Sequence, residues 1–195
     1  MYKRIAIAAA AAAAAAALAG CQADEAGDNA AATANNTQAA AAPSGNLAQA
    51  VAGSARFRQA VEAAGLQATL TGPGPYTVLV PADAAFAKLP KDEVERLMQP
   101  AAKPELTAVL TYHILPGTIL RADLQRAIQN GGGKAVLATM AGKTVTATGQ
   151  GDRIILTDQA GRQVALTGPE KLATNGVVHQ IDGVLLPATR PARPS

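Results

Sequence analysis

Few side chains in this sequence are placed for catalysis. A hydrolytic triad needs a nucleophile beside its base, but the serines stand only at Ser44, Ser54 and Ser195, and none lies in a Gly-x-Ser-x-Gly turn. A metal site needs several ligands at short spacing, whereas His113 and His179 are far apart and the chain has a single cysteine. We therefore expect a protein that is not an enzyme and that holds no metal or other cofactor.

Two further patterns have ordinary structural explanations. The three glycines at 131–133 are followed by Lys134, but the Lys-Ser/Thr ending of a phosphate-binding loop is missing, so a flexible connector is expected. Asp92, Glu93 and Glu95 could in principle supply paired carboxylates for glycoside hydrolysis. They fall together on the charged face of a predicted helix, where solvation explains them equally well.

The single cysteine lies in a specific context. Lys3 and Arg4 precede an apolar run at 5–18 that ends in Leu-Ala-Gly-Cys, with the cysteine at Cys21. A run this short is typical of a cleaved export signal rather than of a permanent membrane span, which needs about 20 apolar residues. Residues 18–21 resemble the bacterial lipobox, which implies that Cys21 is lipidated and becomes the first residue of the mature chain. The alternative is an ordinary signal peptide that leaves Cys21 as a stray thiol.

The lipobox resemblance also implies where the protein resides. We expect residues 1–20 to be a lipoprotein signal peptide and the mature chain to be attached to the bacterial cell envelope through its lipid. In lipoproteins, an Asp directly after the cysteine favours retention in the inner membrane, and here that residue is Gln22. The resemblance therefore favours the outer membrane, while the choice between a periplasmic and an outward orientation stays open.

Residues 21–45 are predicted to form a disordered tether. They are mostly alanine with small polar and acidic residues and contain no large apolar side chain, so they cannot bury enough surface to offset the entropy of ordering. A coil of about 24 residues has a root-mean-square reach of roughly 27 Å. The formal net charge of +3 includes Lys3 and Arg4 of the signal, and the remaining charges form no nucleic-acid patch.

Residues 46–187 have the length of one domain, followed by a short tail at 188–195. Apolar periodicity predicts helices early in this domain, and β-branched alternation predicts strands late. The fold class is therefore α+β. Helices are expected within 47–64 and at 84–89, 92–98, 104–111 and 122–128; strands are expected at 76–80, 135–140, 143–148, 153–157 and 163–166, with a last strand pair within 176–186.

Three stretches of this domain resemble the fasciclin (FAS1) family. They are Thr-Val-Leu-Val-Pro-Ala-Asp-Ala-Ala-Phe at 77–86, Leu-Thr-Tyr-His-Ile-Leu-Pro-Gly at 110–117 and Asn-Gly-Val-Val-His-Gln-Ile-Asp-Gly-Val-Leu-Leu-Pro at 175–187. They are similar to the family's H1 segment, its Tyr-His motif and its H2 segment, in the same order. The resemblance implies a wedge-shaped β-sandwich with helices packed at one side.

The resemblance also indicates two residues that could contact a partner. In some adhesive members of the family the Tyr-His pair has been associated with receptor contact, which makes Tyr112 and His113 candidate partner contacts. A half-buried pair that holds strands together by hydrogen bonds is the alternative.

Four further motif residues have structural explanations. Asp83 is expected to cap the helix that follows it, and Phe86 is expected to anchor the core. His179 has apolar neighbours and is expected to be an interior histidine. Asp182 with Gly183 predicts a bend or bulge in the terminal strands.

Three functions are compatible with these expectations. The first is a lipid-anchored fasciclin-like domain that mediates adhesion by contacting a surface protein, matrix component or polysaccharide. The second is a small-ligand carrier or periplasmic stress-related protein with an enclosed apolar cavity of several hundred Å³ between helices and sheet. The third is a hydrolase. Adhesion predicts an exposed apolar or basic patch near Tyr112 and His113.

Overall fold

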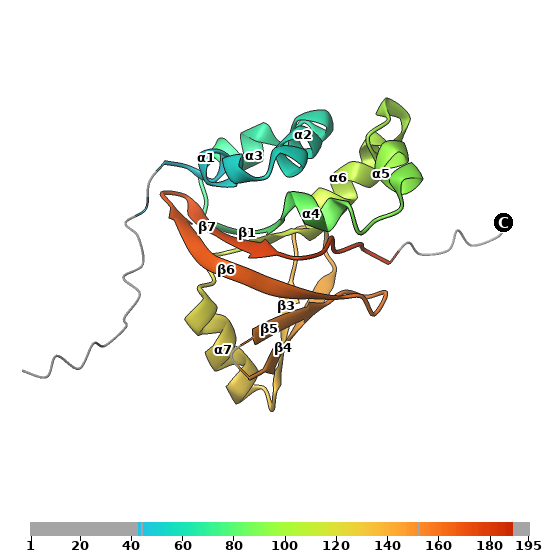
Figure 1. The fold of residues 1–195 in the computed structure, drawn as a ribbon. Helices are drawn as coiled ribbons and strands as arrows, with labels where there is room; N and C mark the ends of the chain where they lie inside the picture. Colours follow the sequence, from blue (N-terminus) through green and yellow to red (C-terminus); the bar gives the residue numbers. More distant parts are fainter. Residues whose placement is uncertain (1–42, 44, 152, 189–195) are drawn as a thin grey trace, which may run out of the picture. The chain divides into compact units, whose positions relative to one another are not determined.

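A computed structural model describes residues 43, 45–151 and 153–188 (Figure 1). The predicted signal peptide (1–20), Cys21, nearly all of the tether (21–45) and nearly all of the tail (188–195) lie outside the described residues. Within the described residues, no helix combines the length and the apolarity needed to cross a membrane.

Helices make up most of the first half of the domain. The α-helices are α1 (Leu47–Ala50), α2 (Ala55–Ala64), α3 (Gln67–Thr71), α4 (Asp83–Phe86), α5 (Lys91–Leu97), α6 (Lys103–Tyr112) and α7 (Arg121–Asn130), with short 3₁₀ turns at Val51–Gly53 and Pro100–Ala102.

The strands form one sheet in the order β2-β1-β7-β6-β5-β4-β3. Strands β1 and β7 are parallel, and every other neighbouring pair is antiparallel. The Met140 amide, just after β3, donates a hydrogen bond to the Ile114 carbonyl of β2 (2.8 Å), so the two end strands meet and the sheet nearly closes. Their bounds are β1 (Tyr76–Pro81), β2 (Ile114–Pro116), β3 (Lys134–Ala138), β4 (Thr144–Gln150), β5 (Arg153–Thr157), β6 (Gln163–Ala173) and β7 (Gly176–Ile181).

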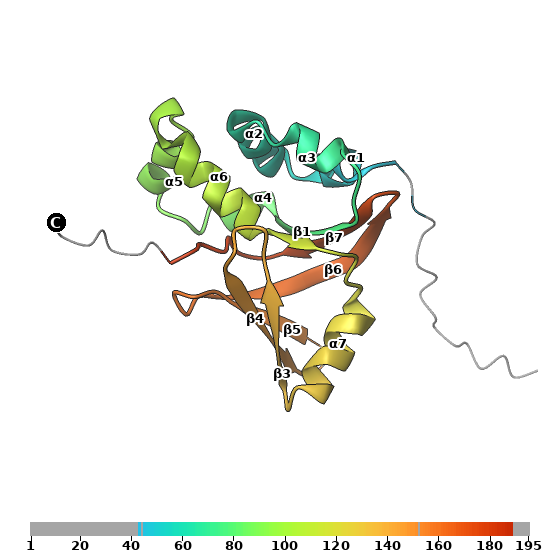
Figure 2. The same ribbon diagram turned by 180° about the vertical axis from the view of Figure 1, so that it is seen from behind.

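The helices lie on two sides of this sheet. Helices α1 to α6 cover the half of the sheet that contains β1 and β7, and α7 lies beside β3 and β4 (Figures 1 and 2). The first half of β6 pairs with β5 and its second half with β7, with a register shift between Thr167 and Lys171. Strand β6 therefore joins the two halves of the sheet.

Strand β1 separates two parts of the core. Val78 and Val80 pack under the helices with Phe57 and Leu110, whereas Leu79 packs between the two halves of the sheet with Leu156. Every residue of β1 after Tyr76 is buried. This explains the continuous apolar run, because a strand covered on both faces has no solvent side to alternate with.

The turn between β6 and β7 fastens the first helices to the sheet. The Asn175 side chain accepts a hydrogen bond from the Leu47 amide (2.8 Å) and donates to the carbonyls of Leu70 (3.0 Å) and Gly72 (2.9 Å). A Cβ at the next residue, Gly176, would overlap the Tyr76 backbone oxygen of β1. Glycine is required there because two backbones approach closely.

The predicted α+β class and the order of the predicted elements are confirmed, with four local differences. Helix α3 and strand β2 were not predicted. Strand β6 continues to Ala173 instead of ending near 166, because the bulge around Gly168 (φ +64°) accommodates the turn-forming residues within the strand. The predicted last strand pair is wrong beyond Ile181: after a bend at 182–183, residues 184–188 bond to side chains instead of to a strand.

Candidate functional site

Tyr112 and His113 lie in the interior, where α6 gives way to β2. Their exposed fractions are 0% and 1%. The suggestion that these side chains contact a partner directly is not supported, because a partner cannot reach them in this structure. The alternative, a buried pair that holds the surrounding segments by hydrogen bonds, matches the observed geometry.

The Tyr112 hydroxyl joins the end of α6 to the start of β4. It donates a hydrogen bond to the Thr144 carbonyl (2.7 Å). Burial, more than any other influence, raises the pKa of this phenol above its usual value, with a smaller contribution from the Asp158 carboxylate. Tyr112 therefore remains a neutral donor.

The contacts of His113 specify its tautomer. Nδ1 lies 2.8 Å from the Val109 carbonyl, which can only accept, and Nε2 lies 3.2 Å from the Leu185 amide, which can only donate. The proton is therefore on Nδ1. Burial lowers the pKa of His113 to about 4, although the hydrogen bond to Val109 and the charge of Asp158 act in the opposite direction. His113 is thus neutral and holds the extended segment at 184–188.

Asp83 caps a different helix from the predicted one. Its own helix α4 has Ala82 at the N-cap and receives no side-chain cap. Instead, the Asp83 carboxylate accepts a hydrogen bond from the Arg56 amide in the first turn of α2 (3.0 Å). Asp83 therefore joins α4 to α2. Phe86 is partly buried and packs against two core clusters, in keeping with its expected role as an anchor.

The two motif residues on and after β7 also make structural contacts. His179 is 2% exposed, and its Nε2 lies 2.7 Å from the Ile119 carbonyl, so it is an interior histidine. Burial is the main reason that its pKa is lowered. Asp182 lies in the bend after β7 and accepts from the Ala165 amide (2.7 Å), while Lys88 approaches its other oxygen (3.6 Å).

An open groove lies directly beside this buried pair, and we call it the Leu186 groove. It has a volume of about 530 Å³ and runs between helices α5 and α6 on one side and the turns β3–β4 and β5–β6 on the other. Its lining consists of Glu93, Arg96, Leu97, Glu105, Ala108, Val109, Lys143, Ala160, Arg162, Leu186, Pro187 and Ala188. Tyr112 and His113 thus support the walls of the groove without being part of its surface.

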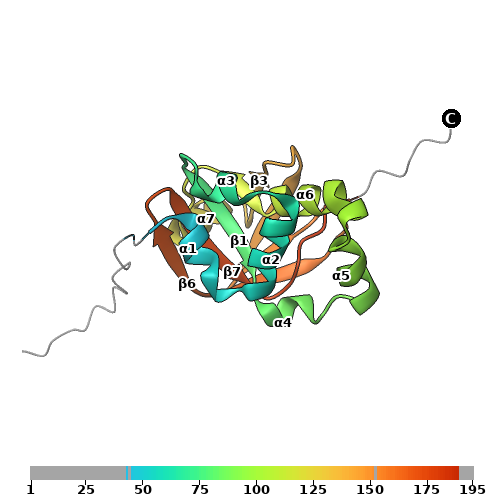
Figure 3. The same ribbon diagram turned by 90° about the horizontal axis from the view of Figure 1, so that it is seen from above.

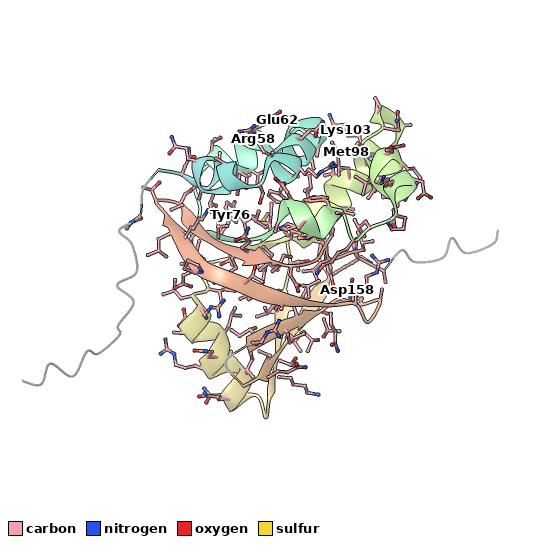
Figure 4. All side chains as sticks on the ribbon, viewed as in Figure 1. Arg58, Glu62, Tyr76, Met98, Lys103 and Asp158 are labelled. Carbon is pink, nitrogen blue, oxygen red and sulfur yellow. The ribbon has the colours of Figure 1, made fainter. Side chains whose placement is uncertain are left out.

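Asp158 is a buried residue of this site that the sequence did not single out. The side chain is almost fully buried at the β5–β6 turn, near the end of the described chain (Figure 4). One carboxylate oxygen accepts from the amides of Ala160 and Arg162 (both 2.9 Å), and the other accepts from the Leu186 amide (3.1 Å). The Asp-Gln-Ala-Gly sequence at 158–161 is a turn signal, but nothing local indicates that its carboxylate also fixes Leu186.

The two walls of the groove carry different charged side chains. On the helical wall, Arg96 forms a bidentate ion pair with Glu105 (2.6 and 2.9 Å), which lowers the pKa of that carboxyl. On the turn wall, the Lys143 ammonium donates to the Ala188 carbonyl (2.8 Å). Among the described residues, no carboxylate lies within 4.0 Å of the charged atoms of Lys143 or Arg162.

A second pocket, which lies below the helices and is lined mostly by apolar side chains, is far smaller. It lies among Phe57, Phe86, Leu106 and neighbouring side chains and has a volume of about 30 Å³. Drug-sized ligands occupy pockets of roughly 300 Å³ or more. In the described part of the chain, no cluster of three or more His, Cys, Asp or Glu residues is arranged to bind a metal ion.

Comparison with known proteins now decides the family. The model of the fasciclin domain matches residues 52–187, well over half of the chain. The chain belongs to the fasciclin family. Within this fasciclin domain the three motifs lie on β1 and α4, on α6 and β2, and on β7 with the segment after it.

Two relatives contain the fasciclin domain within a longer chain. Protein sll1483 of Synechocystis sp. is 35% identical over 128 residues, which cover 66% of this chain and 64% of that protein. The transforming growth factor-beta-induced protein ig-h3 of Sus scrofa is 33% identical over 132 residues, which cover 67% of this chain and 17% of that protein. The fasciclin domain is thus only a part of each of these proteins.

A solved structure has the same fold. It is a FAS1 domain pair from the insect cell adhesion molecule fasciclin I, with a TM-score of 0.64 and 18% identity, and the match covers 74% of this chain and 51% of that chain. The predicted fasciclin-like fold is therefore confirmed.

Proposed function

We propose that this fasciclin domain is attached to the bacterial cell envelope by lipid on Cys21 and mediates adhesion, without catalysis, by binding a surface protein, matrix component or polysaccharide. The Leu186 groove is the binding surface. The outer membrane is the favoured location because Gln22 follows the cysteine.

The size of the Leu186 groove and its place beside the Tyr112–His113 pair are the observation that carries the proposal. At about 530 Å³, the groove is large enough for several side chains of a partner, whereas the apolar pocket of about 30 Å³ below the helices is too small for the ligand of a carrier. The small apolar pocket therefore gives no support to the carrier alternative. The likeness to an insect cell adhesion molecule is consistent with adhesion.

The position of the groove suits a tethered binding domain. Helix α1, where the described helices begin, and helix α5, on the wall of the groove, lie at opposite ends of the helical layer (Figures 1 and 3). The groove therefore lies away from α1, the first described helix.

The binding role is tested by filling the groove. Ala108 is exposed on α6 and lines the groove, and Ala127 is exposed on α7, on another side of the sheet. In detergent-solubilised full chain, Ala108→Trp should abolish binding to surfaces coated with cell envelope or extracellular matrix, and Ala127→Trp should not. Equal binding by the two variants, or no binding by the unmodified chain, would refute the proposed surface.

The anchor is tested separately by mass spectrometry of the mature N-terminus. We expect the mature chain to begin at Cys21 and to carry acyl groups, and Cys21→Ser should lose the incorporation of labelled fatty acid. A mature chain with an unmodified thiol would contradict lipid anchoring and leave the binding role unaffected.

A further inference from the structure

We propose that the Leu186 groove binds an extended peptide segment that carries acidic side chains next to apolar ones. This inference rests on the proposed function and specifies the chemistry of the partner.

The charge distribution in the groove provides the first argument. Lys143 and Arg162 stand on the turn wall without a carboxylate partner among the described residues. On the helical wall, the charge of Arg96 is already compensated by Glu105, and Glu93 adds a further negative charge. An acidic side chain in the groove is therefore attracted to the turn wall and repelled by the helical wall, which fixes the orientation of a bound segment.

The apolar floor provides the second argument. Leu97, Val109, Leu186 and Pro187 line the base of the groove, and all four are aliphatic. The first three are each at most 9% exposed, so the apolar surface that they offer is narrow. Sugars are commonly bound by stacking on aromatic rings, and none of the lining residues is aromatic. An aliphatic floor favours apolar peptide side chains, which bury surface at about 25 cal/mol per Å².

Other occupants agree less well with these charges. The chain's own residues 189–195 contain Arg190 and Arg193, which the uncompensated charges of Lys143 and Arg162 would repel. A sulfated polysaccharide would satisfy the basic wall but would leave the aliphatic floor without an apolar partner.

The walls are held in place before a partner binds. Asp158 bonds both the β5–β6 turn and the Leu186 amide, and His113 bonds the Leu185 amide. A preorganised groove loses less conformational entropy when a segment binds.

Fluorescence anisotropy with synthetic probes tests this proposal on the purified full chain in detergent. The probe is a fluorescein-labelled peptide of alternating Glu and Leu, and the matched peptides replace every Glu by Gln or every Leu by Gly. We expect the Glu-Leu peptide to bind most tightly and to weaken at high salt, since screening reduces exposed charge interactions.

Three variants locate the interaction. Arg162→Glu should weaken binding of the Glu-Leu peptide by about fivefold or more, because it replaces an attraction with a repulsion. Glu93→Gln should strengthen binding, because it removes a negative charge from the helical wall. A variant that merely lost its fold would bind more weakly. Arg58→Glu makes the same charge change on the exposed outer face of α2, away from Asp158 and the groove (Figure 4), and should leave binding unchanged.

Several results would overturn the inference. These are equal binding of the Gln-Leu peptide, equal effects of Arg162→Glu and Arg58→Glu, groove-dependent binding of heparin in place of the peptide, or self-association through the groove in sedimentation. If Ala108→Trp abolishes surface binding but Arg162→Glu does not affect it, the proposed function stands and this inference fails.

Discussion

Acidification is expected to destabilise this fasciclin domain through His113. The folded protein keeps the imidazole neutral because Nε2 accepts a hydrogen bond from the Leu185 amide and the ring is fully buried. Protonation would place an N–H on Nε2 against the Leu185 N–H, so the segment at 184–188 would lose this attachment.

The magnitude follows from the two pKa values. The pKa of His113 is about 4 in the folded protein, against 6.5 for an unperturbed histidine. The unfolded state therefore takes up the proton first as the pH falls. The contribution of His113 to stability is complete above pH 6.5 and is lost progressively as the pH falls to about 4. Linkage gives a loss of about 2 kcal/mol at pH 5 and about 3 kcal/mol in total.

Urea unfolding followed by circular dichroism measures this effect, since the chain contains no tryptophan for a fluorescence assay. The reference is His113→Gln, which keeps an acceptor for the Leu185 amide but cannot be protonated. His179, whose pKa is also lowered by burial, and the carboxyl groups titrate in both proteins, so the difference between their pH profiles isolates His113.

We expect the unfolding free energy of the unmodified protein to fall by about 2 kcal/mol more than that of His113→Gln between pH 7.5 and pH 5. Parallel pH profiles for the two proteins would refute the reasoning. A normal histidine pKa for His113 in an NMR titration of the folded protein would refute it as well.

Two stability predictions concern contacts between distant elements. Asp83→Ala should lower the unfolding free energy by about 1 kcal/mol, because the Arg56 amide at the start of α2 loses its cap; urea unfolding with no measurable change would show that this cap contributes nothing. Gly176→Ala should cost about 3 kcal/mol or more, because its Cβ overlaps the Tyr76 carbonyl. Gly149→Ala, whose Cβ would make only an ordinary contact (3.5 Å), is the control, and equal melting temperatures of the two glycine variants would contradict the proposed overlap.

The sequence predicted the helices and strands whose hydrophobic pattern is visible within the segment itself. Apolar spacing at 104–111 and 122–128 predicted α6 and α7 to within a few residues, and the β-branched run at 76–80 predicted the buried strand β1. These predictions succeed because periodicity reports how a segment is buried, whatever it packs against. The predicted lipidation of Cys21 rests on equally local residues and remains a prediction.

The partners of each element were decided by tertiary structure alone. Sequence reasoning placed Asp83 on its own helix, whereas it caps a helix that begins 28 residues earlier in the chain. It left the exposure of Tyr112 and His113 open, and their burial follows from packing between α6, β4 and the segment at 184–188. The Leu186 groove combines residues from 93 to 188, so no local pattern indicates it. The sequence alone determined the family and the local structure, and the fold determined the groove that is proposed to bind a partner, because a groove forms only where distant segments pack together.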